Sequence, residues 1–197
     1  SFEATLAAAG VAAVALAPAL AAWLGWLTYR DWHVDQPTTR KPDRRAVSEL
    51  AKREDYQRQN QLTHFVPIKP GRLRFWSLRF VLWAIDLLAR RVYNQGALGD
   101  IRTIHYARWV FVGKDVGAGA ARELPAHERY THLLFFSNYD GSWESYLGDF
   151  VDMERKGLTG VWSNTDGYPR TTLLLFGGAQ DEDNFKDWTR LHQLPTG

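Results

Sequence analysis

The run from Thr5 to Leu27 constrains this chain more than any other feature, because it holds 23 residues without a charged side chain, Asn, Gln or His. As a helix it rises about 34 Å at ~1.5 Å per residue, slightly more than the hydrocarbon core of a bilayer. The run therefore predicts a single transmembrane anchor at residues 1–30, with the remainder of the 197-residue chain outside the bilayer core.

A cleaved secretory signal is the alternative interpretation of the same run. Ala19-Leu20-Ala21 has the small-x-small pattern of a cleavage site. However, no Lys or Arg precedes the apolar stretch, and Trp23 and Trp26 continue its apolar character past the candidate site. We therefore favour an anchor.

The flanks of the run predict its orientation. Glu3 is the one charged residue on its N-terminal side, whereas the C-terminal side carries Arg30, Arg40, Lys41, Arg44 and Arg45. Basic flanks stay in the cytoplasm, so we expect a single-pass protein of the bacterial inner membrane whose soluble part faces the cytoplasm. Interfacial aromatic residues mark the headgroup level, and here we expect Trp23, Trp26 and Tyr29 to do so.

Composition limits the possible partners. The chain has 24 Lys and Arg against 22 Asp and Glu, a net charge of +2, which gives no electrostatic support for a nucleic-acid partner. It has no cysteine, which removes disulfides, thiolate metal sites and cysteine nucleophiles from consideration. His127 and His132 have Glu128 beside them but no further Asp or Glu nearby that would complete a metal site, so we expect solvated loop histidines and no metal.

Residues 31–71 read as a linker followed by a polar helical neck. The stretch from Asp31 to Asp43 contains two prolines and little periodicity, which is typical of an extended linker. Arg44 to Leu62 is polar and rich in helix formers, with a thin apolar stripe. It predicts a solvated helix that needs a partner for stability.

A second strong signal is the segment from Arg72 to Tyr93, within a region predicted at residues 72–95. It combines bulky apolar residues with arginines at helical spacing, as in-plane interfacial helices do. A core helix covered by the domain on two sides is the equal alternative, and a second span is weaker because Arg79 and Asp86 would lie at membrane depth. The residues expected to contact lipid or a partner are Arg72, Trp76, Arg79, Trp83 and Arg90.

Residues 96–197 show an alternation of short strands and helices. The predicted strands are Ile104–Gly113, Thr131–Ser137, Leu158–Ser163 and Thr171–Phe176, and the predicted helices are Trp143–Lys156, capped by Ser142, and Asp181–Gln193. This order predicts an α+β fold with a ferredoxin-like antiparallel sheet and helices on one face.

Four segments of this region resemble a family of bacterial membrane-associated proteins that has no established activity. They are Ile104–Trp109, Leu133–Trp143, Val161–Thr165 and Gly177–Glu182, and the similarity covers the chain from about Leu62 onward. The stretch from Ser137 to Trp143 is its most specific part. The resemblance implies a ferredoxin-like unit and leaves the function open.

A looser similarity links the chain to dye-decolorising peroxidases, which also use ferredoxin-like units and carry a Gly-x-x-Asp-Gly motif. The matching string has Ser137 in place of the first glycine and ends in Asp140-Gly141. The similarity implies Asp140 and Arg108 as catalytic residues and haem as a cofactor, with His105 or His192 as its ligand. A turn whose side chains bond the backbone is the simpler interpretation of this string.

Arg108 and Arg170 are candidates for buried ion pairs with Asp140 or Asp149.

The leading functional prediction is an accessory or structural subunit of a larger membrane complex, of respiratory or photosynthetic type, rather than an enzyme. A membrane-tethered, haem-dependent peroxidase-like enzyme and a lipid or quinone binding protein remain as alternatives.

Overall fold

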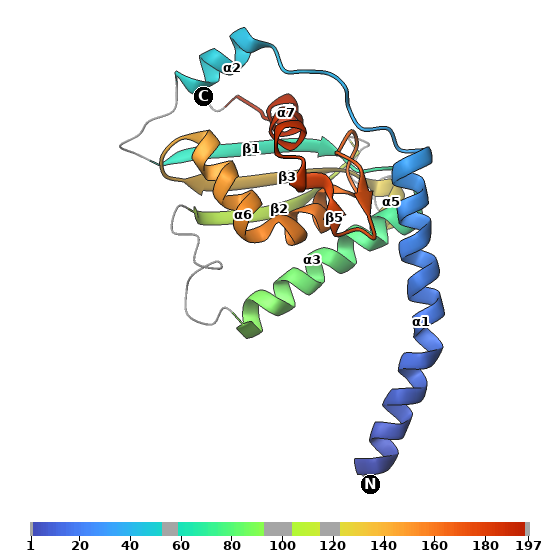
Figure 1. Cartoon of the computed structure of the whole chain (residues 1–197). Helices are drawn as coiled ribbons and strands as arrows, with labels where there is room; N and C mark the ends of the chain where they lie inside the picture. Colours follow the sequence, from blue (N-terminus) through green and yellow to red (C-terminus); the bar gives the residue numbers. More distant parts are fainter. Residues whose placement is uncertain (1, 53–58, 93–103, 115–122, 196–197) are drawn as a thin grey trace.

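The computed structural model of the chain describes residues 2–52, 59–92, 104–114 and 123–195; the side chains at 2–15, 92, 104, 150, 153 and 154 lie outside this description. The elements are α1 (Phe2–His33), α2 (Arg44–Ala51), β1 (Asn60–Pro67), α3 (Arg72–Val92), β2 (Ile104–Gly113), α5 (Ala126–Arg129), β3 (Tyr130–Tyr139), α6 (Trp143–Trp162), β4 (Thr171–Thr172), β5 (Phe176–Gly177) and α7 (Glu182–His192) (Figure 1). A short 3-10 turn, Gly178–Gln180, precedes α7.

The main sheet is antiparallel and has β3 in its middle, between β1 and β2. Its register places Phe135 of β3 opposite His64 on one side and Trp109 on the other. Because neighbouring side chains along a strand point to opposite faces, these three residues share one face of the sheet. The next row along β3, centred on Leu134, belongs to the other face.

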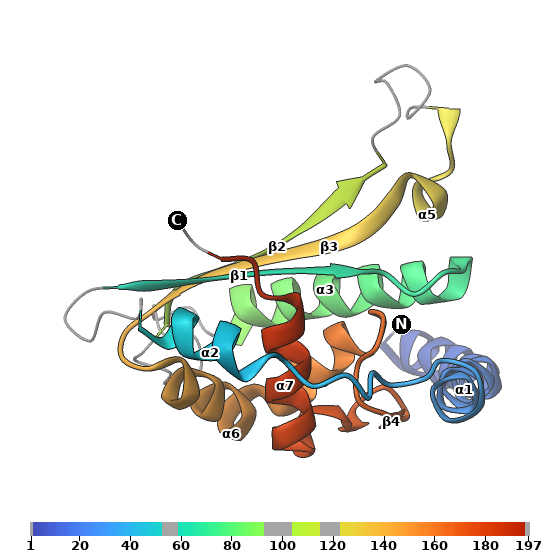
Figure 2. The same ribbon diagram turned by 90° about the horizontal axis from the view of Figure 1, so that it is seen from above.

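The described helices α2, α3, α6 and α7 lie on one side of this sheet (Figure 2). The strand residues that face this side are buried, among them Leu62, Leu133 and Phe135. They pack against the aromatic side chains of the helices, including Trp162 of α6 and Trp188 of α7. The prediction of an α+β fold with an antiparallel sheet and helices on one face is confirmed at this level.

Two helices begin at the capping residues that the sequence predicted. The Ser142 hydroxyl accepts a hydrogen bond from the Ser145 N–H at 3.2 Å and begins α6. Asp181 caps α7 in the same way, and acidic residues in the first turn of α7 complement the helix dipole. Strand β2 has the predicted bounds, and α3 runs from the predicted start at Arg72 to Val92, with the rest of the predicted segment outside the described residues.

The predicted strand from Leu158 to Ser163 is wrong, because α6 continues through Gly157 to Trp162. A glycine inside a helix costs only about 1 kcal/mol relative to alanine. Leu158, Val161 and Trp162 are all buried and stand at the i, i+3, i+4 spacing of one helix face. Burial of this face outweighs the glycine.

The polar neck predicted from Arg44 to Leu62 is wrong at its end, and residues 53–58 of it lie outside the described residues. Helix α2 ends at Ala51, and β1 begins at Asn60. Buried residues alternate along β1 at Leu62, His64 and Val66, which is the period of a half-buried strand. The sequence contained this alternation, but a histidine in the middle of the buried set concealed it.

A turn interrupts the strand predicted from Thr171 to Phe176. Leu173 and Leu174 adopt φ values of 50° and 67°, in the left-handed region that a β-strand does not use. They reverse the chain, so that two-residue strands β4 and β5 pair antiparallel. The local reversal carries Leu173 and Leu175 to the surface.

The segment predicted as an extended linker contacts the folded domain. The Thr38 N–H donates to the Gly167 carbonyl at 2.8 Å, and Lys41 Nζ lies 2.5 Å from the Asp187 carboxylate of α7. The linker therefore runs along the surface of the domain, from the end of α1 to α2 (Figure 1).

Candidate functional site

Helix α3 has a buried side and an exposed side. Phe75 and Leu78 are buried against the core, whereas Trp76, Phe80 and Trp83 are 53%, 52% and 57% exposed. The exposed aromatic residues recur every three or four positions, so they form one stripe along the helix. Helix α3 therefore packs on the core with one side and presents an apolar stripe with the other.

The turn between β4 and β5 extends this stripe. Leu173, Leu175 and Phe176 are 42%, 41% and 48% exposed. The turn lies against α3, because a Cβ atom built on Gly160 would stand 3.2 Å from a methyl of Val81 and 3.4 Å from a methyl of Leu175. We call the combined surface the apolar face; it consists of Trp76, Phe80, Trp83, Leu173, Leu175 and Phe176.

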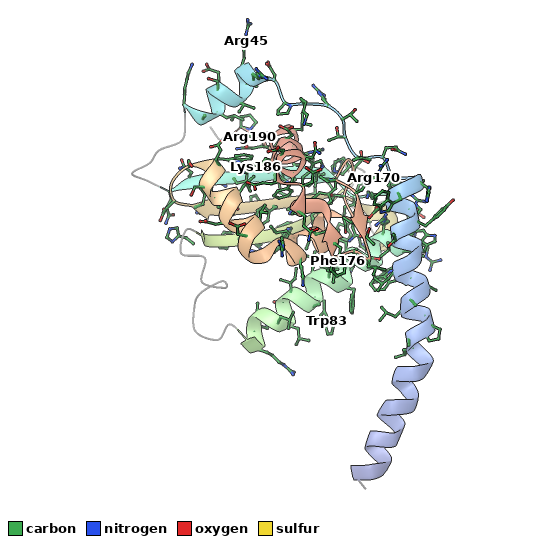
Figure 3. The ribbon with its side chains drawn as sticks, in the orientation of Figure 1. Arg45, Trp83, Arg170, Phe176, Lys186 and Arg190 are labelled. Carbon is green, nitrogen blue, oxygen red and sulfur yellow. The ribbon has the colours of Figure 1, made fainter. Side chains whose placement is uncertain are left out.

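Helix α1 joins the domain beside this apolar face. The Trp23 indole N–H donates to the Ser77 hydroxyl of α3 at 2.9 Å, and the Trp23 ring meets Phe80 edge-on at 5.9 Å. Leu27 is fully buried one turn later. The part of α1 before Trp23 projects away from the domain, on the side where Trp83 and Phe176 lie (Figures 1 and 3).

A buried cluster of charges holds the C-terminal end of α1. The Asp31 carboxylate accepts from Lys69 Nζ at 2.8 Å, and also from Arg74 and from the Thr171 hydroxyl. Asp31, Lys69 and Arg74 are 3%, 5% and 0% exposed. Lys69 also donates to the Ser163 carbonyl at 2.8 Å. One carboxylate of α1 is thus bonded to α3, to β4 and to the segment before α3.

Asp35 extends the buried cluster beyond the end of α1. Its carboxylate receives Arg30 at 2.8 Å and Arg74 at 2.7 Å. Burial acts to raise the pKa of Asp35, but the hydrogen bonds from the two arginines outweigh burial and hold the pKa below its ordinary value. For Lys69, burial is the largest effect, and it lowers the pKa despite the neighbouring Asp31.

The buried charges are not the ones that the sequence suggested. Arg108 and Arg170 were the candidates for buried ion pairs, yet both are exposed. The Arg170 guanidinium lies over the Trp32 ring at 5.4 Å. Asp31 and Lys69 escaped notice because both stand in residues 31–71, predicted as linker and polar neck, where no apolar periodicity marks them as buried.

The predicted contact residues lie on or beside the apolar face. Arg72, Arg79 and Arg90 are exposed on α3, and the Arg79 guanidinium lies 5.4 Å from the centre of the Trp76 ring. Trp26 is half-buried beneath Arg30, at 5.5 Å. Tyr29, 58% exposed, lies against the His33 ring. Basic and aromatic side chains are therefore interleaved along this side of the molecule.

The structure brings two of the peroxidase candidates together. His105 Nε2 lies 2.7 Å from the Asp140 carboxylate, and both side chains are largely exposed, at 41% and 53%. A haem ligand and the acid that cleaves peroxide act from opposite faces of the haem plane, and two groups in direct contact leave no room for that plane. The His105 and Asp140 pair therefore does not fit a haem site.

The other peroxidase candidates lie elsewhere. Arg108 is level with Phe136 in the sheet, whereas Asp140 comes four residues later, about 13 Å along the strand direction. His192 packs against Trp188 at the end of α7, where its Nδ1 bonds the Trp188 carbonyl at 2.9 Å. Burial lowers the pKa of His192. The four residues do not share one site.

A histidine that the sequence analysis passed over lies in the core. His64 of β1 is 1% exposed, and neither ring nitrogen has a hydrogen-bond partner among the described residues. Its ring contacts Trp162, Trp188 and His192 beside a cavity of about 20 Å³, enough for one water molecule. Burial, followed by the neighbouring His192, holds the pKa of His64 well below its ordinary value.

Within the described residues, no group of three or more His, Cys, Asp or Glu side chains could hold a metal ion. Within the same residues, no helix is both long enough and apolar enough to cross a membrane. The predicted span from Thr5 to Leu27 lies partly outside them, because side chains are described only from Leu16 onward.

Comparison with known proteins gives no match: no protein family, curated protein or solved structure is similar to this chain.

Proposed function

We propose that the protein is a membrane-tethered accessory subunit whose domain lies on the cytoplasmic surface of the bilayer. One observation carries the proposal: the apolar face and the projecting part of α1 lie on the same side of the domain (Figures 1 and 3). A bilayer that accommodates α1 would then also meet Trp76, Phe80 and Trp83.

The length of α1 beyond the domain supports this arrangement. The sequence from Thr5 to Ala22 provides 18 uncharged residues before Trp23. At ~1.5 Å per residue they extend about 27 Å, close to the ~30 Å thickness of the hydrocarbon core. Trp23 would then lie at the boundary of the core, level with Phe80 of α3.

The residue types of the apolar face also support its contact with the headgroup layer of the bilayer. Tryptophan and arginine are suited to this layer, because each combines an apolar body with a polar or charged end. Arg72, Arg79 and Arg90 flank the exposed rings of α3. The surplus of basic residues after α1 supports a cytoplasmic orientation by the positive-inside rule.

The buried charge cluster gives the tether a definite role. Because Asp31 bonds Lys69 and Arg74 inside the domain, α1 is attached to the domain rigidly and not through a flexible linker. A helix fixed to its domain would set the orientation of that domain on the bilayer. Such fixed orientation suits a subunit that packs its helix against the helices of a larger assembly, and a respiratory or photosynthetic complex is the type that we propose.

We also infer that the sheet is a ferredoxin-like one. The order β1, α3, β2, β3, α6 and the sheet order β1-β3-β2 agree with that topology. Gln193 forms an antiparallel bridge with His64, and the Leu194 N–H donates to the Thr63 carbonyl at 2.8 Å. The chain after α7 thus returns to the free side of β1, where the last strand of such a unit would lie.

The absence of cysteine permits a direct test. Phe80→Cys and Asp183→Cys, each labelled with a polarity-sensitive dye, place the probe on the apolar face and on the exposed surface of α7. We expect the dye at position 80 to shift to the blue when the full chain is reconstituted into phospholipid vesicles, and the dye at position 183 to keep its spectrum. Equal spectra at both positions would exclude a membrane-facing apolar face.

The subunit part of the proposal needs its own measurement. The full chain is extracted from its native membrane in mild detergent and separated by size, and every co-eluting chain is identified and quantified. We expect a particle much larger than 22.5 kDa with partners in fixed stoichiometry. A particle that contains no other chain would contradict the accessory role while leaving the membrane-facing surface to the dye experiment.

A further inference from the structure

The sheet presents a second apolar surface, on the side away from the helices. The described helices α2, α3, α6 and α7 all lie on the opposite side of the sheet (Figure 2). Its centre is formed by side chains that are half-buried. We call it the open sheet face; its apolar centre consists of Phe65, Val110, Val112, Leu134 and Phe136.

The register of the strands arranges this face in rows. In the middle row Leu134 lies between Phe65 and Val110, so the row is wholly apolar. The row on one side contains Phe136 and Arg108, and the row on the other contains His132 and Val112. The flanking rows also contain the polar residues Thr63, Arg108 and His132, and further polar residues follow toward the ends, beginning with Asn138.

Such a surface is unusual for an antiparallel sheet covered on one side. The solvent side of such a sheet is normally polar, and strands that are apolar on both faces belong to sheets that are covered on both. In β2, Trp109 and Phe111 serve the core while Val110 and Val112 face outward. The residue pattern is that of a buried face.

We propose that a second copy of this chain covers the open sheet face with its own open sheet face, about a twofold axis. Isologous packing of this kind requires a patch that is complementary to itself. The twofold axis lies between the two sheets, parallel to the middle row and perpendicular to the strands. About this axis, Leu134 packs near Leu134 of the second copy. The two flanking rows then meet each other, so that Phe136 lies opposite His132 of the second copy.

The charge distribution of the open sheet face supports a second copy of the chain as the partner. The open sheet face contains no Asp or Glu in the rows between Asn138 and His132, so self-packing buries no carboxylate. Arg108 stands on β2, an edge strand of the sheet, from which its guanidinium can reach water past Val112 of the second copy.

The size of the face agrees with a specific contact. The eight residues of β1 extend about 26 Å, and three strands are about 14 Å wide. Two such corrugated faces bury on the order of 1,000 Å² in total, at the lower end of specific interfaces. Because α1 runs across the strands in Figure 1, this axis also keeps both α1 helices on the same side, as one bilayer would require.

Chemical cross-linking tests the proposal in the full-length chain. Facing sheets lie ~10 Å apart, so thiols introduced by Leu134→Cys come within reach of a short bis-maleimide across the axis. Asp183→Cys, on exposed α7 and on the helix side of the sheet, is the matched control. We expect a cross-linked dimer of twice 22.5 kDa from the first variant and only monomer from the second.

A disrupting variant completes the test. Leu134→Lys places a charge at the centre of the proposed interface, and we expect it to convert a dimer, measured by light scattering, to a monomer with an unchanged circular dichroism spectrum. If that variant does not fold, the cross-linking result decides alone. A monomeric unsubstituted chain at every concentration, or equal cross-linking of both cysteine variants, would overturn the proposal, and neither result bears on the apolar face of α3.

Discussion

The indole N–H of Trp23 donates to the Ser77 hydroxyl across 2.9 Å and so connects α1 to α3 through two residues that lie 54 positions apart in sequence. The Ser77 hydroxyl in turn donates to the Leu73 carbonyl of its own helix at 2.6 Å. Ser77 is 2% exposed and Trp23 is half-buried, so the contact is partly shielded from water. The bond fixes the height at which the projecting part of α1 leaves the domain.

We expect Trp23 and Ser77 to be energetically coupled. A neutral hydrogen bond in a buried place contributes about 0.5–1.5 kcal/mol to stability. Trp23→Phe keeps an aromatic ring beside Phe80 but removes the donor, and Ser77→Ala removes the acceptor. Urea unfolding of both single variants and of the double variant should give a coupling energy in that range. Additive losses would show that ring packing alone joins the two helices.

The Asp31 cluster predicts a much larger effect. Asp31→Ala would leave Lys69 and Arg74 buried without their shared carboxylate, and breaking a buried ion pair from one side costs about 3–5 kcal/mol. The matched control is Glu49→Ala, which removes an exposed partner of Lys52 at a cost below ~0.5 kcal/mol. Thermal or urea unfolding compares the two. Equal losses would mean that the cluster is open to water.

His64 predicts an acid-sensitive fold. The unfolded chain binds a proton at His64 below about pH 6.5, while the folded chain does not, because its pKa there is depressed. Stability therefore falls as the pH drops below 6.5, by ~1.4 kcal/mol per pH unit for each such histidine. His192, whose pKa is also lowered, adds to the slope.

His64→Leu should remove its share of this slope and leave stability near pH 8 unchanged or higher, because leucine brings no unpartnered ring nitrogen into the core. Urea unfolding from pH 8 to pH 5 measures the effect. His105→Gln, at an exposed position, is the control and should retain the slope of the unsubstituted chain. The same slope in all three proteins would contradict a buried neutral His64.

The parts of the fold that the sequence predicted are those with strong local signals. Ser142 is a cap followed by an amphipathic helix, and β2 is a run of bulky residues that ends at a glycine. The errors lie where long-range packing overrides local preference. Gly157 looks like a helix end, yet α6 continues because the following residues are buried on one helix face.

The candidate site likewise contains residues that the sequence predicted and residues that it did not. Trp76 and Trp83 were predicted as contact residues because their spacing on one helix is visible in the sequence, and both are exposed. Asp31, Lys69 and Arg74 are distant in sequence, and only the tertiary fold brings them together. No local pattern reports such a cluster. The pairing of His105 with Asp140 likewise depends on the register of β2 with β3.

Two glycines test the packing between α6 and the turn that carries part of the apolar face. Gly178 has a φ of +57°, and a Cβ atom there would stand 2.7 Å from the Tyr168 ring and 2.8 Å from a methyl of Thr159. Gly178→Ala should therefore lose about 1–3 kcal/mol through clash and backbone strain. Gly148→Ala, in α6 with open space around it, should gain about 0.5–1 kcal/mol from helix propensity. Urea midpoints that move in opposite directions confirm this packing, whereas a tolerated alanine at 178 would mean that the turn and the apolar leucines it carries can shift away from α6.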